Sequence, residues 1–170
     1  MKKYTIPFFL LGSVVMIYVM AKTGAPLKTP ATLHGILDLE FAYNAEKTTV
    51  VINAWASLDN IVAAKLNTWL DFLFLFFYSL FLFFACKKIA GTFHGTVAKA
   101  GQLIAKGALV AGFLDILENM GMLIALNGHI SGSIALCTTF VSVIKWVLAI
   151  MALLYVLTGV ITLGYRIIKN

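Results

Sequence analysis

The chain contains 170 residues, of which 61% are hydrophobic and 12% are charged, and its formal net charge is +6. A chain this apolar is neither disordered nor an ordinary soluble domain, and its length fits one domain. The net positive charge does not indicate nucleic-acid binding, because the basic residues are divided among short segments that flank apolar runs.

The first apolar run extends from about Tyr4 to Ala21. A membrane helix needs roughly 17–25 mainly apolar residues, so this run is long enough. Lys2 and Lys3 before it and Val19-Met20-Ala21 at its end also resemble a signal peptide with a small-residue cleavage site. We expect the run to be retained as the first membrane helix.

The segment that follows predicts short amphipathic helices over about 29–68 rather than a loose loop. Thr29-Pro30 can begin a first helix that ends near Phe41. Asn44 can cap a second helix through Trp55, and Ser57 can cap a third that leads into the next membrane helix. We expect these helices to cap the mouth of the bundle, and a lid over a substrate is the alternative.

Three further apolar runs of membrane length follow, at about 69–86, 109–126 and 134–164. The last is longer than a bilayer needs, so we expect it to tilt or to project beyond one surface. Residues 87–106 are predicted to connect two helices, and Asn127-Gly128-His129 predicts a tight turn. The sequence therefore predicts an all-α fold over residues 1–170, a single integral membrane domain in which four transmembrane helices form a bundle.

Charge placement predicts which side of the membrane each segment occupies. The segments that contain both termini and residues 87–106 carry basic residues and no Asp or Glu, whereas the 22–68 segment carries both signs. By the positive-inside rule, this pattern places both termini in the cytoplasm and the 22–68 segment outside. The basic residues on the cytoplasmic side would also favour anionic membrane lipids as partners. The oligomeric state is not predicted.

The cysteines and histidines do not predict a cofactor or a metal site. Cys86 and Cys137 are expected near opposite ends of the bundle, too far apart for a disulfide. His34, His94 and His129 lie in different loops and lack the spacing of metal ligands.

Seven polar residues inside the apolar runs form the candidate site. A charge near the middle of a membrane helix costs at least roughly 2.5–3.5 kcal/mol, so such residues are paired or functional. Helical spacing places the polar residues of each run on one face, so that the three faces can converge inside the bundle. The candidate ligand-binding or network residues are Asp71, Tyr78, Asp115, Glu118, Asn119, Ser142 and Lys145.

Electrostatics limit how these groups can be arranged. We predict that Lys145 lies within about 4 Å, or one bridging water, of Asp115 or Glu118, because an unpaired buried charge is too costly. The second carboxyl would then be protonated or bonded to a polar neighbour such as Asn119, Ser142 or Tyr78. A functional site and a purely structural network both fit this pattern.

The aromatic residues are expected to have ordinary structural roles. Trp146 lies too deep in its run for the interfacial belt and is expected to pack in the core. Trp69 is expected at the membrane boundary, and the Phe-rich run 72–84 is expected to face lipid.

Four functions are compatible with these features. The first is a pocket within the bundle that binds a lipid or another apolar small molecule. An intramembrane enzyme that modifies lipids by carboxylate acid–base chemistry is the second, although no nucleophile or metal site is evident. A small proton-coupled carrier and a structural partner subunit are the others.

The chain also resembles a group of bacterial four-helix inner-membrane proteins. The residues that carry the resemblance are Leu39-Glu40, Trp55, Leu70-Asp71-Phe72-Leu73-Phe74, Tyr78, Leu114-Asp115 and Glu118-Asn119. The resemblance implies the fold and the bacterial inner membrane as the compartment, and it implies no activity.

Overall fold

The structure, a computed structural model, describes residues 3–169, except for the side chains of residues 166 and 167. The described secondary structure is helical, apart from one isolated backbone bridge between Thr29 and Thr32. In chain order the elements are α1 (Thr5–Thr23), the 3-10 helix η1 (Ala25–Leu27), α2 (Ile36–Glu40), α3 (Ala45–Ala56), α4 (Ile61–Ala90), α5 (Gly95–Leu126) and α6 (Gly132–Lys169).

Four of these helices, α1, α4, α5 and α6, are long and apolar enough to cross a membrane. The 30 residues of α4 correspond to a length of about 45 Å, which exceeds the hydrocarbon core of a bilayer. Helix α5 is the most enclosed, because 56% of its apolar stretch is buried, against 11% for α1. The predicted helical bundle is confirmed, and α5 lies at its centre.

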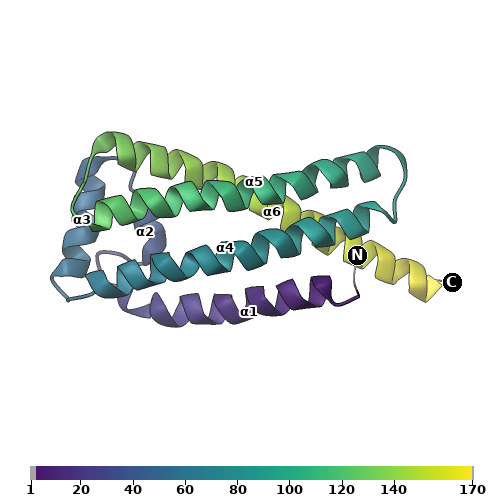
Figure 1. Cartoon of the computed structure of the whole chain (residues 1–170), viewed down its shortest axis with the longest axis horizontal. Helices are drawn as coiled ribbons and strands as arrows, with labels where there is room; N and C mark the ends of the chain where they lie inside the picture. The colour runs from purple at the N-terminus through teal and green to yellow at the C-terminus, as the bar shows by residue number, and fades with distance from the viewer. Residues whose placement is uncertain (1–2, 170) are drawn as a thin grey trace.

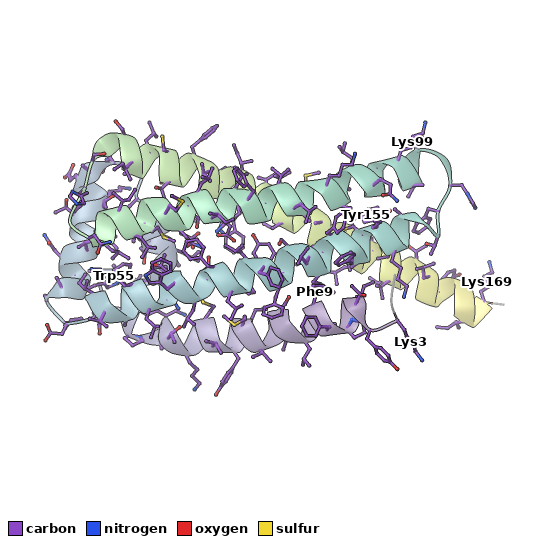
Figure 2. The ribbon with its side chains drawn as sticks, in the orientation of Figure 1. Lys3, Phe9, Trp55, Lys99, Tyr155 and Lys169 are labelled. Carbon is purple, nitrogen blue, oxygen red and sulfur yellow. The ribbon has the colours of Figure 1, made fainter. Side chains whose placement is uncertain are left out.

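The four long helices run side by side, with the short helices gathered at one end (Figure 1). We call this the cap end, formed by residues 25–57. Both ends of the described chain lie at the opposite end, which we call the terminal end. Lys3, Lys99 and Lys169 lie at the terminal end, whereas Trp55 lies at the cap end (Figure 2).

The connection between α4 and α5 is much shorter than the sequence predicts. Instead of a connection over residues 87–106, helix α4 continues to Ala90 and α5 begins at Gly95. Apolar length marks only the part of a helix that a bilayer can hold, and a helix can continue beyond it. Here Gly101 and Ala105 are buried in that extension, so tertiary packing supports it.

The cap end confirms one of the predicted short helices and corrects two. Asn44 caps α3, and its Oδ1 accepts a hydrogen bond from the Lys47 backbone N–H at 2.8 Å. The first helix begins only at Ile36, because Thr29 forms a tight turn with Thr32 instead of capping a helix. Ser57 ends α3 instead of beginning the third helix, which starts at Ile61 and continues into the membrane-length helix α4, as predicted.

The tight turn at 127–129 is confirmed, with Gly128 at a positive φ of 92°. The Phe-rich run does not simply face lipid as predicted. The ring of Phe9 on α1 stacks on Phe84 at 5.7 Å between centroids, and Phe77 packs over Gly12, where a larger residue would collide with its ring. Part of the run therefore holds α1 against α4.

Two apolar clusters fill the bundle. The terminal-end cluster includes Leu82, Cys86, Ile89, Ala108 and Ala152 from α4, α5 and α6. The cap-end cluster joins the cap to the bundle through residues that include Leu27, Leu39, Val51, Trp55 and Met122. Along α5, Asp115 and Glu118 lie between Ala108 of the first cluster and Met122 of the second.

Candidate functional site: a buried carboxylate and lysine network

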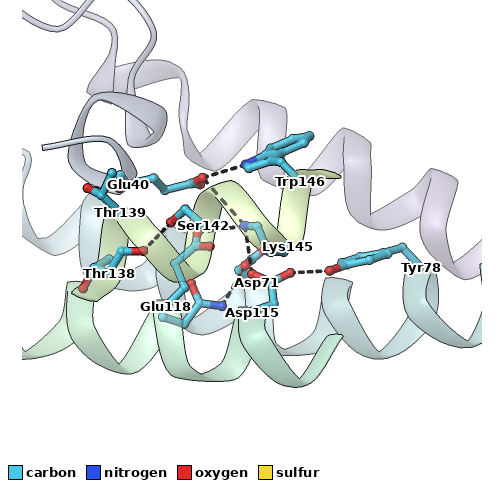
Figure 3. A network of polar contacts seen from close by, with 11 residues as sticks. Glu40, Asp71, Tyr78, Asp115, Glu118, Thr138, Thr139, Ser142, Lys145 and Trp146 are labelled. Carbon is cyan, nitrogen blue, oxygen red and sulfur yellow. Dashed lines mark hydrogen bonds and ion pairs between the residues drawn. The ribbon is translucent and has the colours of Figure 1, made fainter. Parts of the chain in front are cut away.

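Lys145 of α6 is the centre of a buried polar network (Figure 3). Its Nζ lies 2.8 Å from Glu118 Oε1, 3.1 Å from Asp115 Oδ1 and 3.7 Å from Glu40 Oε2. All four residues are more than nine-tenths buried. The predicted approach of Lys145 to Asp115 and Glu118 is therefore correct.

Two further hydrogen bonds connect α4 to the network. The Tyr78 hydroxyl donates to Asp115 Oδ2 at 2.7 Å, and the Asn119 amide donates to Asp71 Oδ2 at 2.7 Å. These contacts follow from helical spacing, because Asp115 and Asn119 are four residues apart and project from one face of α5. Three helices thus present polar faces to one another, as the sequence predicts.

Ser142 is fully buried on the same face of α6 as Lys145. Its hydroxyl, however, donates to the Thr138 backbone oxygen at 2.8 Å, within its own helix. Ser142 therefore does not donate to a carboxyl, which was one of the predicted arrangements. Tyr78 and Asn119 donate to carboxyls instead, to Asp115 and Asp71 respectively.

Glu40 belongs to the network although the sequence places it in the external segment. Helix α2 carries Glu40 to the side of α6, where Glu40 Oε2 accepts a hydrogen bond from Trp146 Nε1 at 3.1 Å. The Thr139 hydroxyl also donates to the Glu40 backbone oxygen at 2.9 Å. Trp146 is 40% exposed and lies beside the Glu40 carboxylate (Figure 3), so its predicted position in the core is wrong.

Glu40 is one of the residues that carry the resemblance noted above, but nothing else in the sequence distinguishes it from Asp38. It stands between Leu39 and Phe41, but Asp38 stands between Leu37 and Leu39 in the same way. In the structure Asp38 lies on the other side of α2, where it accepts a hydrogen bond from the His34 backbone N–H at 2.8 Å. The position of α2 against α6 therefore determines that Glu40, and not Asp38, joins the network.

Acidic groups outnumber basic groups in the network. Three carboxyls, those of Glu40, Asp115 and Glu118, surround the ammonium of Lys145, and a fourth, Asp71, joins the network through Asn119. If all were ionised, the formal charge would be −4 + 1 = −3, which is too costly in an apolar interior without protons or other donors. Two fully buried acceptors, Glu118 Oε2 and Asn119 Oδ1, have no hydrogen-bond partner among the described residues.

The other candidate features lie apart from the network. The buried Cys86 thiol donates to the Ala152 backbone oxygen at 3.5 Å, and Cys137 is exposed, with both cysteines free. Among the described residues, no group of three His, Cys, Asp or Glu is arranged to hold a metal ion.

Two surface hollows lie at the ends of the bundle. One of about 420 Å³ lies at the cap end, where Tyr43 and Lys47 line it, and one of about 410 Å³ lies at the terminal end beside Phe84 and Lys87. No residue of the network lines either hollow.

Comparison of the chain with protein-family models, curated proteins and solved structures gave no match. The fold and the network define the class: a helical bundle with four helices long and apolar enough to span a membrane and a buried carboxylate and lysine network at its centre. The interpretation of that network rests on its own geometry.

Proposed function

We propose that the protein is a multi-pass protein of the bacterial inner membrane that binds the polar head of a lipid or another amphiphile in this network. The observation that carries the proposal is a buried network with more carboxyls than cations and with unpaired acceptor atoms, enclosed by apolar residues. Enclosed apolar walls with a few convergent polar groups are typical of small-molecule sites.

The charge distribution supports a membrane orientation with both termini in the cytoplasm. Lys3, Lys99 and Lys169 lie together at the terminal end, and the acids of residues 22–68 belong to the segment that forms the cap end. The positive-inside rule then places the terminal end in the cytoplasm and the cap end outside.

The position of the two apolar clusters favours entry from the side of the bundle. Along the bundle axis, the terminal-end cluster and the cap-end cluster separate the network from both ends. On the side of the bundle, Glu40 belongs to the short helix α2, and its carboxylate accepts a hydrogen bond from Trp146, which is 40% exposed. An amphiphile in the bilayer could reach the network here while its tail stays in lipid, and the same arrangement disfavours a proton path across the bundle.

A purely structural network is the second candidate, because Lys145 already has three carboxylates within 4 Å. Replacing a buried ionic group by apolar residues of similar volume is often neutral or stabilising, so a structural network would tolerate this change. Binding of an amphiphile would not tolerate it.

The test is a triple variant, Asp115→Leu with Glu118→Met and Lys145→Met. We expect it to fold and to lose lipid that co-purifies with the wild type, measured by native mass spectrometry and lipid extraction. The matched control replaces three charges by Met at exposed positions, Glu46→Met with Lys99→Met and Lys106→Met. A folded triple variant that keeps as much bound lipid as the control would show that the network only holds the helices together.

A further inference from the structure

We propose that the head group bound in the network is cationic, a primary ammonium on an apolar tail. This inference rests on the proposed function and adds the chemical class of the ligand. It follows from the charges, the unpaired atoms and the donors that the network contains.

The charges of the network disfavour an anionic head group. Lys145 is its only cation among the described residues, and three carboxylates already surround it at 2.8, 3.1 and 3.7 Å. A ligand phosphate or carboxylate would add negative charge to four carboxyls and would have no free cation to bind. An ammonium instead reduces the excess of negative charge.

The unpaired atoms also favour a hydrogen-bond donor. Glu118 Oε2 and Asn119 Oδ1 are both acceptors, both fully buried, and consecutive on α5. A buried acceptor without a donor is unfavourable, so a ligand that supplies donors removes this penalty on binding. A primary ammonium carries three N–H donors and no acceptor, which complements this set.

The neighbouring donors are already engaged and do not compete for these acceptors. The Tyr78 hydroxyl donates to Asp115, the Asn119 amide to Asp71, and the Trp146 indole to Glu40. The hydroxyl of Ser142 donates to the backbone of its own helix. The donors for Glu118 Oε2 and Asn119 Oδ1 therefore come from the ligand.

Binding of four amphiphiles with the same twelve-carbon tail tests the head group: dodecylamine, dodecyltrimethylammonium, dodecanol and dodecanoate. Binding to the purified full chain in a neutral maltoside detergent at constant pH is measured by native mass spectrometry. Binding to the triple variant is subtracted to remove association with the micelle. We expect dodecylamine to bind at least about tenfold more tightly than dodecanol, because charge-assisted hydrogen bonds are stronger than neutral ones.

The other two amphiphiles separate charge from hydrogen bonding. Dodecyltrimethylammonium has the charge without N–H donors, so we expect it to bind more weakly than dodecylamine. Dodecanoate should bind most weakly of the four. The Glu118→Gln variant should lose most of the preference for dodecylamine over dodecanol. If that variant does not fold, Glu40→Gln replaces it in the same measurement. The control variant Glu46→Gln, at an exposed position, should keep the wild-type preference.

The outcomes distinguish the two proposals. Two results would overturn the cationic head group: equal binding of all four amphiphiles, or tightest binding of dodecanoate. If that binding is lost in the triple variant, the proposed function still holds. If no amphiphile distinguishes the wild type from the triple variant, both proposals fail.

Discussion

Lys145 joins three elements of the fold through one side chain. It lies on α6, contacts Asp115 and Glu118 of α5, and approaches Glu40 of α2. Moving an ammonium and a carboxylate out of water costs several kcal/mol per ion, and only close pairing offsets that cost. The short distances around Lys145 are therefore a condition of its burial, whether or not a ligand binds.

Removal of Lys145 alone should destabilise the fold. We expect Lys145→Met to lower the free energy of unfolding by about 3–5 kcal/mol, because Asp115 and Glu118 lose their positive partner and stay buried. Reversible unfolding by a denaturing detergent in mixed micelles measures the change. Lys106→Met, at an exposed position on α5, should stay within about 0.5 kcal/mol of the wild type. A similarly small loss for Lys145→Met would mean that the carboxyls do not depend on it.

At the scale of whole elements, close contact between helices explains how polar faces can meet at the centre of the bundle. A Cβ atom at Gly112 of α5 would lie 2.8 Å from the Cβ of Ser79 on α4. Gly121 similarly allows Thr138 of α6 to approach α5. Small residues at such positions let helix backbones approach, which is common between membrane helices.

Gly112→Ala should therefore weaken the packing of α4 against α5. Both Cβ atoms are fixed to their backbones, so the helices must separate, and we expect a loss of about 1–3 kcal/mol. Gly107→Ala on the same helix is the control, because its new Cβ would lie 3.5 Å from the flexible end of Leu148. Unfolding of the two variants under identical conditions measures the difference. Equal stability of the two variants would contradict this account of the interface.

At the scale of the whole molecule, polarity divides the bundle along its length. An apolar cluster, the polar network and a second apolar cluster follow one another from the terminal end to the cap end. The basic residues collect at the terminal end, and the cap end carries acids and bases together. This asymmetry is the basis of the proposed orientation.

Labelling of cysteines by a membrane-impermeant thiol reagent in intact spheroplasts tests that orientation. In a background without Cys86 and Cys137, we expect Asp59→Cys, in the turn between α3 and α4 next to the cap end, to be labelled from outside. Lys99→Cys at the terminal end should be labelled only after the membrane is opened, since the positive-inside rule places it in the cytoplasm. The reverse pattern would invert the assignment and place the cap in the cytoplasm.

The sequence by itself determined the features that depend on local periodicity and composition. Membrane-length apolar runs predict the four long helices, and spacing within α5 and α6 predicts which polar residues share a face. Because an unpaired buried charge is costly, the meeting of Lys145 with Asp115 and Glu118 could also be predicted. These properties need no knowledge of how distant segments pack.

Only the tertiary structure decided which parts of the cap enter the network. Glu40 reaches Lys145 because α2 is held against α6 by contacts such as the hydrogen bond from the Thr139 hydroxyl to the Glu40 backbone oxygen at 2.9 Å. The exposure of Trp146 depends likewise on α2, which is distant in the sequence. Helical periodicity describes one element at a time, whereas these contacts join residues about a hundred positions apart, so packing between elements determines them.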